Sequence, residues 1–331
     1  MKLLLLGGTG FLSSHLVSAA LSRGHEVTLF HRGRTNPERF PEVEHILGDR
    51  ERDLDLLQGR HWDAAIDPCG YLPRVVEASS TYLSERVDQY TFISSGNAYA
   101  DFGKAAVDES SRLATLPDGA SEEISSETYG PYKVLCEQAV ERAMPGRVLI
   151  IRPGLMVGPA DSSGRFTYWP RRIARGGEIL APGEKDLPVE FIDARDVAEW
   201  MILLLERRQV GIYNAAGPAE PLTLQAFLEQ AAEVIGSKSQ YTWVSDAFLS
   251  AHKVESWTEL PLWIPQNEEK FVVSMSFRKA LEAGLTFRPL AQTIQDVLAW
   301  DTAHPDFPVS NATLTPEKEQ ALLHEWHATL G

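Results

Sequence analysis

The chain has 331 residues, a length that suggests two domains or one core with a large lobe, and its 44% hydrophobic content is ordinary for a globular protein. With 31 basic and 46 acidic residues, its net charge of −15 disfavours a broad nucleic-acid surface but leaves room for one basic pocket. Two cysteines, Cys69 and Cys136, provide neither a disulfide framework nor metal-ligand spacing, so we expect a reducing compartment, the cytoplasm.

Two further classes of protein are disfavoured. The N-terminal run of four leucines is too short for a signal-peptide core or a membrane span, and no longer apolar stretch follows. The nine histidines show no metal-ligand spacing such as H-E-x-x-H, so we predict no metal site. We therefore expect neither a membrane nor a metal ion among the partners.

Strands and helices alternate through the first half of the chain. Apolar runs predict strands at 2–7, 25–31, 43–49, 63–70, 89–95 and 147–153. Helical spacing predicts helices at 10–24, after Pro73 and from Tyr129 onward, with a long surface loop at 102–126. This alternation predicts an α/β fold, with a Rossmann-type doubly wound parallel sheet.

The second half has mixed patterns. Helices are predicted at 166–177, 194–208, 222–236, 276–284, 290–300 and 315–330, with a strand at 210–217. We predict a dinucleotide-binding domain at 1–158, to which 190–215 returns. The remainder, 159–189 and 216–331, is predicted to form a smaller mixed α/β C-terminal lobe that binds substrate.

The sequence GGTGFLSS follows the first strand and opens a helix. Gly7 permits a tight turn, and Gly10 lets the backbone approach a pyrophosphate at the positive helix N-terminus. Ser13 replaces the third glycine of the usual fingerprint, so we expect slightly looser strand–helix packing. A plain glycine turn is the alternative, but the strand–turn–helix context favours dinucleotide binding.

The end of the second strand bears on which dinucleotide binds. An acid for the ribose hydroxyls of NAD is expected about 20 residues after the glycines. The sequence instead has His31, Arg32, Gly33 and Arg34 there. A guanidinium can bind a 2′-phosphate through two bonds, so Arg32 favours NADP over NAD, although NAD and a solvated basic loop stay open.

Two more strand ends carry candidate cofactor contacts. Asp49, in GDR, could accept a hydrogen bond from the adenine amino group or serve as a turn aspartate. In DPCG, the small residues Cys69 and Gly70 would let a cofactor pass close to the backbone.

The segment SETYGPYKVLCEQAV contains two tyrosines and a lysine. Positions four apart share a helix face, so Tyr129 can lie over Lys133 while Tyr132 points elsewhere. Pro131 is tolerated only in a first helical turn, which places Tyr129 at the mouth of the helix. An ammonium beside a phenol lowers the phenol pKa from about 10, which would make Tyr129 an acid or base near neutral pH.

Six segments occur in one order: GGTGFL, GDR, FISSGNAY, YGPYK, RPGLMVGP and VEFIDARDVA. Together they resemble the extended short-chain dehydrogenase/reductase family, the NAD(P)-dependent epimerases and dehydratases, over residues 1 to about 215. FHRGRTNPERFPEVEHILGDR is similar to an atypical branch of epimerases, reductases and RNA-binding relatives.

The resemblance implies a catalytic set of Ser95, Tyr129 and Lys133, because Tyr99 in FISSGNAY corresponds to the family tyrosine that selects Ser95. Lys133 would also bind the nicotinamide ribose, and Tyr132 would pack. The cofactor contacts expected under this resemblance are Gly7, Thr9, Gly10, Phe11, Leu12, Arg32, Asp49, Arg50, Cys69, Gly70, Ser94, Tyr129, Lys133 and Pro153. Asn97, Trp169 and Arg171 are candidate substrate contacts.

Two departures from the family pattern bear on the substrate. Gly96 and Asn97 replace the Asp-Glu pair of the dehydratases, which disfavours elimination chemistry. Leu155 replaces the asparagine usual in sugar-nucleotide enzymes, and no basic residue follows Tyr213 until Lys238. A nucleotide-sugar substrate is therefore disfavoured unless Arg171 or Arg172 compensates.

We predict an NADP(H)-dependent oxidoreductase or epimerase that acts at a carbinol or carbonyl carbon of a small polar, sugar-like molecule. The rival is a non-catalytic dinucleotide sensor or RNA-binding protein, which would not need Ser95, Tyr129 and Lys133 together. Trp169, Trp257 and Trp263 could line a substrate pocket, but tryptophans more often pack. We expect no nucleic-acid partner, and the family implies a homodimer formed through helices that flank the sheet.

Overall fold

The computed structural model describes residues 1–100, 107–265 and 274–330; positions 102–106 of the predicted loop lie outside the described residues. The chain divides into two compact units. The first contains residues 1–155, 194–216 and 273–286, and the second contains 156–193, 217–272 and 287–331.

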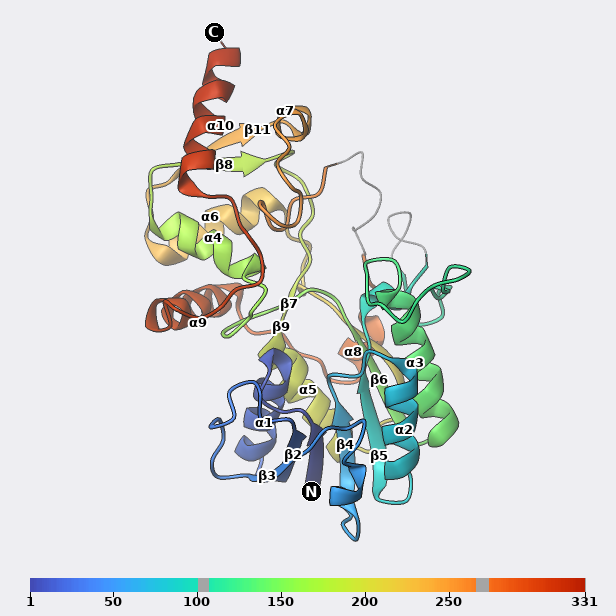
Figure 1. Cartoon of the computed structure of the whole chain (residues 1–331). Coiled ribbons are helices and arrows are strands. Elements are labelled where there is room, and N and C mark those ends of the chain that lie inside the picture. The colour runs from blue at the N-terminus through green and yellow to red at the C-terminus, as the bar shows by residue number, and fades with distance from the viewer. Residues whose placement is uncertain (101–106, 266–273, 331) are drawn as a thin grey trace. The chain divides into compact units, whose positions relative to one another are not determined.

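A seven-stranded sheet forms the centre of the first unit (Figure 1). Its strands are β1 (Lys2–Leu6), β2 (Glu26–His31), β3 (Glu44–Leu47), β4 (Trp62–Asp67), β5 (Val87–Ile93), β6 (Val148–Pro153) and β10 (Gly211–Ala215). They are all parallel, in the order β10-β6-β5-β4-β1-β2-β3. The predicted Rossmann-type, doubly wound sheet is confirmed, and its order reverses between β1 and β4, where such sheets bind ligands.

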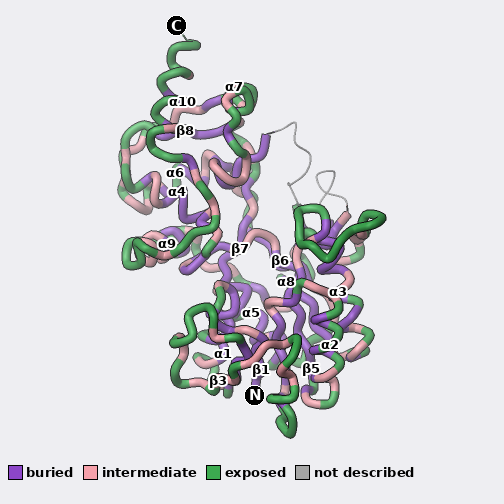
Figure 2. The backbone as a smooth tube through the Cα atoms, viewed as in Figure 1, coloured by how far each residue is buried: buried purple, intermediate pink, exposed green. Residues whose placement is uncertain are grey.

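Helices cover both faces of this sheet. On one face α1 (Phe11–Ser22) packs against α5 (Ala194–Glu206), and on the other α2 (Pro73–Leu83) packs against α3 (Tyr129–Ala143). The unit also contains α8 (Arg278–Glu282) and two 3-10 helices, η1 (Leu54–Leu57) and η2 (Gly96–Ala98). Strands covered on both faces need continuous apolar sequence, and Leu3, Leu4 and Leu5 have no exposed surface. Figure 2 shows the strands at the centre of this unit mainly as buried backbone, in purple.

The second unit has two small parallel sheets, β7 (Met156–Val157) with β9 (Ile192–Asp193) and β8 (Glu178–Pro182) with β11 (Gln240–Val244). Its helices are α4 (Arg165–Ala174), α6 (Leu224–Ile235), α7 (Asp246–Ala251), α9 (Leu290–Ala303) and α10 (Pro316–Thr329). The sequence analysis did not predict β8 and β11. Both strands are short. They pair with each other although they lie far apart in the sequence, and patterns of neighbouring residues do not reveal such a pairing.

The assignment of residues 274–286 to a unit differs from the prediction. The sequence placed all of 216–331 in the C-terminal lobe, whereas 274–286 belong to the first unit. Val107 exchanges backbone hydrogen bonds with Ser274 and Ser276, each 2.8 Å long. Lys279 Nζ donates to the carbonyl of Ile212 on β10 over 2.6 Å. These contacts attach the segment to the sheet of the first unit.

Candidate active site

A cavity of about 360 Å³ opens at the carboxyl edge of the sheet in the first unit. The turns after β1, β2, β3 and β4 and the start of α2 form its walls. Its lining consists of residues 6–10, Ser13, 30–35, 48–51, Cys69, Tyr71, Leu72 and Val75. Parallel strands bring these four turns together because all of them end at the same edge.

The glycine turn brings the backbone close to the cavity. Gly7 and Gly8 both have a φ of +117°, which side-chain-bearing residues rarely adopt. A Cβ on Gly8 would lie 2.5 Å from the side chain of Leu29, so Gly8 is needed for packing, a role the sequence analysis did not assign. Gly10 is the N-cap of α1 and no side chain caps this helix, so its first amides suit an anion.

The loop after β2 presents the exposed side chains of Arg32 and Arg34 to the cavity. His31, where an acid was expected, is buried and braces this loop. Its Nδ1 accepts from the Gly33 amide over 3.1 Å, and its Nε2 lies 2.8 Å from Nδ1 of His45. Burial and the neighbouring His45 lower the pKa of His31, so the imidazole stays neutral and serves the loop.

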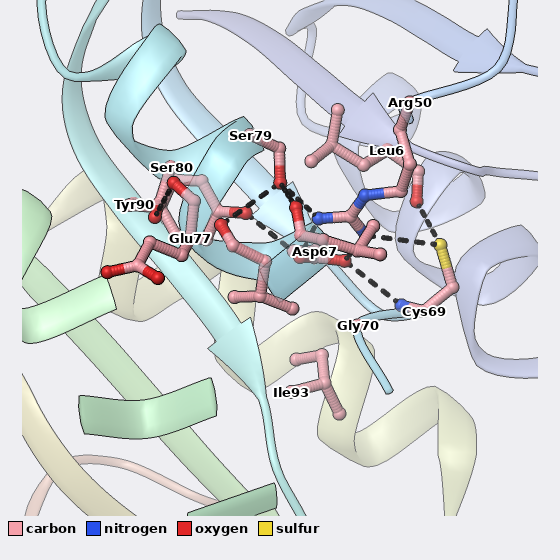
Figure 3. A network of polar contacts seen from close by, with 12 residues as sticks. Leu6, Arg50, Asp67, Cys69, Gly70, Glu77, Ser79, Ser80, Tyr90 and Ile93 are labelled. Atoms are coloured by element: carbon pink, nitrogen blue, oxygen red, sulfur yellow. Dashed lines mark hydrogen bonds and ion pairs between the residues drawn. The ribbon is translucent and has the colours of Figure 1, made fainter. Parts of the chain in front are cut away.

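Arg50 lies in the cavity wall, but its guanidinium fork is already engaged (Figure 3). It donates to both carboxylate oxygens of Asp67, at 2.8 and 2.7 Å, and to Ser79. The Tyr90 hydroxyl and the Cys69 amide also donate to Asp67, over 2.9 and 3.2 Å. Burial acts to raise the pKa of Asp67, but pairing with Arg50 outweighs burial and the net shift is downward.

Asp49 and Cys69 line the cavity with part of their bonding capacity in use. The Asp49 carboxylate accepts from the Glu51 amide over 3.1 Å, as a turn aspartate does. The Cys69 thiol donates to the carbonyl of Leu6 over 2.8 Å, and burial raises its pKa. Cys69 is therefore held as a thiol that fixes the end of β4 beside the glycine turn.

Ser95, Tyr129 and Lys133 lie together in the first unit. Tyr129 is the first residue of α3, so the predicted helix start is confirmed. Helix α3 packs directly on η2, because a Cβ on Gly130 would lie 2.0 Å from the carbonyl oxygen of Asn97. Ser95 is the N-cap of η2 and accepts from the Asn97 amide over 3.1 Å, and its hydroxyl lies near enough to the Tyr129 phenol to affect the pKa of that phenol.

The sequence predicted that the Lys133 ammonium lowers the pKa of the Tyr129 phenol, and this prediction is wrong. Burial raises the pKa of Tyr129, the neighbouring Ser95 hydroxyl lowers it, and the net shift is upward. The Lys133 ammonium donates to the carbonyls of Gly70 and Ile93, over 2.7 and 2.8 Å, and lies 5.9 Å from the centroid of the Tyr129 ring. Burial in turn lowers the pKa of Lys133, against the opposing charge of Asp67.

Tyr132 has the packing position that the sequence predicted. Its side chain is 6% exposed, and its hydroxyl donates to the carbonyl of Ser121. Tyr132 is therefore turned away from Ser95, as the four-residue spacing of Tyr129 and Lys133 implied.

The other predicted contacts vary in position. Thr9 lines the cavity and donates to the Thr35 carbonyl over 2.6 Å, whereas Phe11 and Leu12 begin α1 without lining the cavity. Buried Ser94 and Pro153 lie at the ends of β5 and β6. Gly70 contributes its carbonyl to Lys133, and Asn97 is exposed.

The two substrate candidates in the second unit are engaged within that unit. Trp169 has no exposed surface and donates its indole N–H to the Pro261 carbonyl over 2.8 Å, so it packs rather than lines a site. Arg171 forms a two-bond pair with Asp301, and Arg172 pairs with Glu319 at 2.6 Å. Neither arginine is free to replace the missing diphosphate contacts without losing its carboxylate partner.

Sequence reasoning missed Tyr71 and Asp67. Tyr71 follows the small residues Cys69 and Gly70, and its place after a strand end was the only local signal. Asp67 begins the segment DPCG within the strand predicted at 63–70, and nothing in the sequence indicates that Arg50 pairs with it.

Two features of the described part of the chain bear on its partners. No group of three His, Cys, Asp or Glu side chains there is arranged to hold a metal ion. No helix there has the length and apolar character needed to cross a membrane.

Comparison with known proteins identifies relatives. The model of the "NAD dependent epimerase/dehydratase family" matches residues 3–72 and 69–216. Ketoreductase azaE of Aspergillus niger is 26% identical over 246 residues, covering 60% of this chain and 71% of the relative. Epimerase family protein SDR39U1 of Bos taurus is 26% identical over 256 residues, covering 71% and 81%. The structure of UDP-glucuronic acid 4-epimerase from Bacillus cereus in complex with NAD has a TM-score of 0.66 at 17% identity, covering 92% and 99%.

Proposed function

Because the chain belongs to the NAD-dependent epimerase/dehydratase family, we propose that it is an NADP(H)-dependent reductase or epimerase in which Tyr129 transfers the proton. The observation that carries the proposal is the packing of α3 on η2, which brings Tyr129 to Ser95, with the Lys133 ammonium 5.9 Å from the centroid of the Tyr129 ring. Tyr71 connects this group to the cavity, since it lines the cavity and its ring centroid lies 6.4 Å from that of Tyr129.

Four observations support a nicotinamide dinucleotide in the cavity. Its glycine turn and the uncapped N-terminus of α1 suit a pyrophosphate. Its volume and its position at the reversal of strand order are typical of cofactor sites. Gly7, Thr9 and Gly10 would hold the pyrophosphate, and Lys133 the nicotinamide ribose. The bound cofactor would supply a hydride to a carbonyl carbon, or accept one from a carbinol.

The raised pKa of Tyr129 favours the reduction step. A protonated phenol is the form that donates its proton to a carbonyl oxygen when hydride adds to the carbonyl carbon. The Ser95 hydroxyl, which already accepts from the Asn97 amide, keeps its own proton to donate to the same oxygen or to the phenolate left behind. Solvent then returns the proton to Tyr129. Epimerisation would follow if the carbonyl compound were formed and reduced again on its other face before release.

Arg32 and Arg34 support a preference for NADP. Both are exposed in the cavity wall beside the end of β2, where a 2′-phosphate would be neutralised by a guanidinium. His31 stands where NAD-binding relatives of this fold have an acid, and it is buried and neutral. It therefore offers no carboxylate to the 2′ position of the ribose.

The substrate we propose is a small polar carbonyl compound, such as a sugar derivative, without a nucleoside diphosphate. Leu155 stands where sugar-nucleotide enzymes have asparagine, and Arg171 and Arg172 are paired with Asp301 and Glu319. A diphosphate would have to compete with these carboxylates.

The test begins with the purified full chain. Mass spectrometry would identify any retained dinucleotide, and titration would compare the affinities of NADPH and NADH. A panel of small ketones, aldoses and ketoses would then be screened for loss of absorbance at the reduced-nicotinamide band. Tight NADPH binding with turnover of one substrate class is expected; failure to bind either dinucleotide would overturn the proposal.

A further inference from the structure

Tyr71 lines the cavity and also contacts Lys133, a contact that the proposed mechanism does not use. It follows β4, directly after the Gly70 carbonyl that accepts from Lys133. Its side chain is 47% exposed, although it is large and aromatic. Tyr71 thus lines the cavity, and the centroid of its ring also lies 6.4 Å from that of the Tyr129 ring.

The contacts of Lys133 explain why an aromatic ring stands there. The residue is 2% exposed, and its ammonium donates to two backbone carbonyls. Its Nζ also lies 4.9 Å from the ring centroid of Tyr71 and 4.9 Å from that of Phe92. Both distances are within the range in which a ring face attracts a cation. The ammonium is therefore held by carbonyl dipoles and aromatic faces, and its ion-pair partners are more distant.

We propose that Tyr71 is a positioning residue, whose ring holds the Lys133 side chain as an ammonium directed at the nicotinamide ribose. This inference rests on the proposed function for the role of Lys133. A ring stabilises the charged lysine but not the neutral amine, and desolvated cation–π contacts are stronger than exposed ones. Burial acts in the other direction, since it lowers the pKa of Lys133. The ring compensates for part of this cost.

The ring of Tyr71, rather than its hydroxyl, carries this role. Burial and the neighbouring Tyr129 raise the pKa of Tyr71 to about 12, so the phenol stays neutral and protonated over the working range of an enzyme. A phenylalanine would present the same face to Lys133. A leucine would fill similar space and offer no quadrupole.

Other titratable groups also face Lys133 and affect its pKa. Asp67 ends β4 and Cys69 follows it, while Cys136 and Glu137 come from α3. Tyr129 lies on the same helix turn. Because the first four groups stay in place in all variants, and position 129 is the same in all the samples compared, a difference between leucine and phenylalanine at position 71 reports the ring alone.

The experiment measures Lys133 directly, without a ligand. The protein would be labelled with ¹³Cε-lysine, the Lys133 resonance assigned by its loss in Lys133→Met, and its chemical shift followed against pH by NMR. A Tyr129→Phe background removes the titration of that phenol. Tyr71→Leu should titrate about one pH unit lower than the parent, and Tyr71→Phe should titrate as the parent does.

Tyr82→Leu is the matched control, since the Tyr82 ring on α2 contacts Arg86 at 4.0 Å instead of Lys133. It should leave the Lys133 titration unchanged. Equal midpoints for Tyr71→Leu and the parent would overturn the proposal, as would an equal shift in Tyr71→Phe. A dinucleotide titration of the same samples keeps the two proposals apart: absence of binding, with the Lys133 shift present, would count against the proposed function alone.

Discussion

The arginines of the two units are used in opposite ways. In the first unit Arg32 and Arg34 are exposed in the wall of a cavity. In the second, Arg171 and Arg172 are bound to Asp301 and Glu319 and stabilise the fold around them. All four lie near segments that resemble family motifs, so sequence position does not separate them. What separates them is whether a carboxylate of the same unit lies within reach.

The distinction between paired and exposed arginines also holds within the cavity wall, as Arg50 shows. It lines the wall, yet its fork is bound to Asp67, which has no exposed surface. Arg50 can shape the wall and stack against a ligand. The two N–H groups with which it would bind a carboxylate or phosphate already donate to Asp67. The candidate site of the first unit is thus a set of polar groups held by buried partners around a cavity.

The largest effect expected from this comparison is on turnover. Tyr129→Phe removes only a hydroxyl of the first unit, so folding and cofactor affinity should survive, whereas loss of acid–base help should slow reduction about 10²–10⁴-fold. Steady-state rates with a substrate found in the carbonyl screen, at matched cofactor saturation, check this.

Tyr132→Phe is the matched control, because the Tyr132 hydroxyl contacts only the Ser121 carbonyl among the described residues. It should change turnover little. If Tyr132→Phe were the inactive variant, the assignment of the acid would be reversed. If both were fully active, the chemistry would lie elsewhere.

The next effect concerns stability, and it contrasts a buried pair with a partly exposed one. Asp67→Ala leaves the Arg50 fork and the Tyr90 hydroxyl without their acceptor, which should cost about 3–5 kcal/mol. Arg171→Ala breaks a pair whose arginine side chain is 39% exposed, and it should cost about 1 kcal/mol or less. Urea unfolding of both variants measures the difference; equal losses would show that burial does not separate the two pairs.

The pH dependence of stability gives a second view of Asp67. Its folded pKa lies below the unfolded value of about 3.9, so its contribution is present above that pH and is lost as the pH falls through the folded pKa. Asp67→Ala should therefore show a flatter decline of unfolding free energy in acid below about pH 4. A decline as steep as that of the parent would mean that other carboxylates dominate acid unfolding.

A smaller effect is expected on cofactor choice. Arg32→Ala should lose about 1.5–3 kcal/mol of NADPH affinity, roughly a 10- to 100-fold change, with little effect on NADH. Arg142→Ala, an exposed arginine paired with Glu77 on the helices, is the control and should bind both cofactors as the parent does. Equal affinity of the parent protein for NADPH and NADH would refute the assignment.

The smallest effect concerns Ser13, which is 8% exposed and lines the cavity. Its Oγ lies about van der Waals distance from where a Cβ on Gly10 would be, 3.9 Å. Ser13→Gly should fold normally and bind the cofactor at least as well as the parent, because only packing is changed. Calorimetric titration checks this, and a folded variant that no longer binds would identify the hydroxyl as a ligand.

Local sequence determined the strands of the central sheet and their order along the chain. The apolar runs of the strands predicted β1 to β6 and β10, because a strand covered on both faces must be apolar throughout. The spacing of Tyr129 and Lys133 placed both on one side of α3, since helical geometry is set by neighbouring residues. The resemblance of the ordered motifs then predicted Ser95 as their partner.

Tertiary structure alone decided which polar groups are paired and which face the cavity. Arg50 meets Asp67, and Lys133 meets the carbonyls of Gly70 and Ile93, only because separate strands end at one edge of the sheet. Trp169 is buried, and Arg171 bound, by residues far along the chain. The pKa of Tyr129 likewise follows from burial, which no spacing encodes. Desolvation and pairing depend on distances in space, and these arise when the chain has folded.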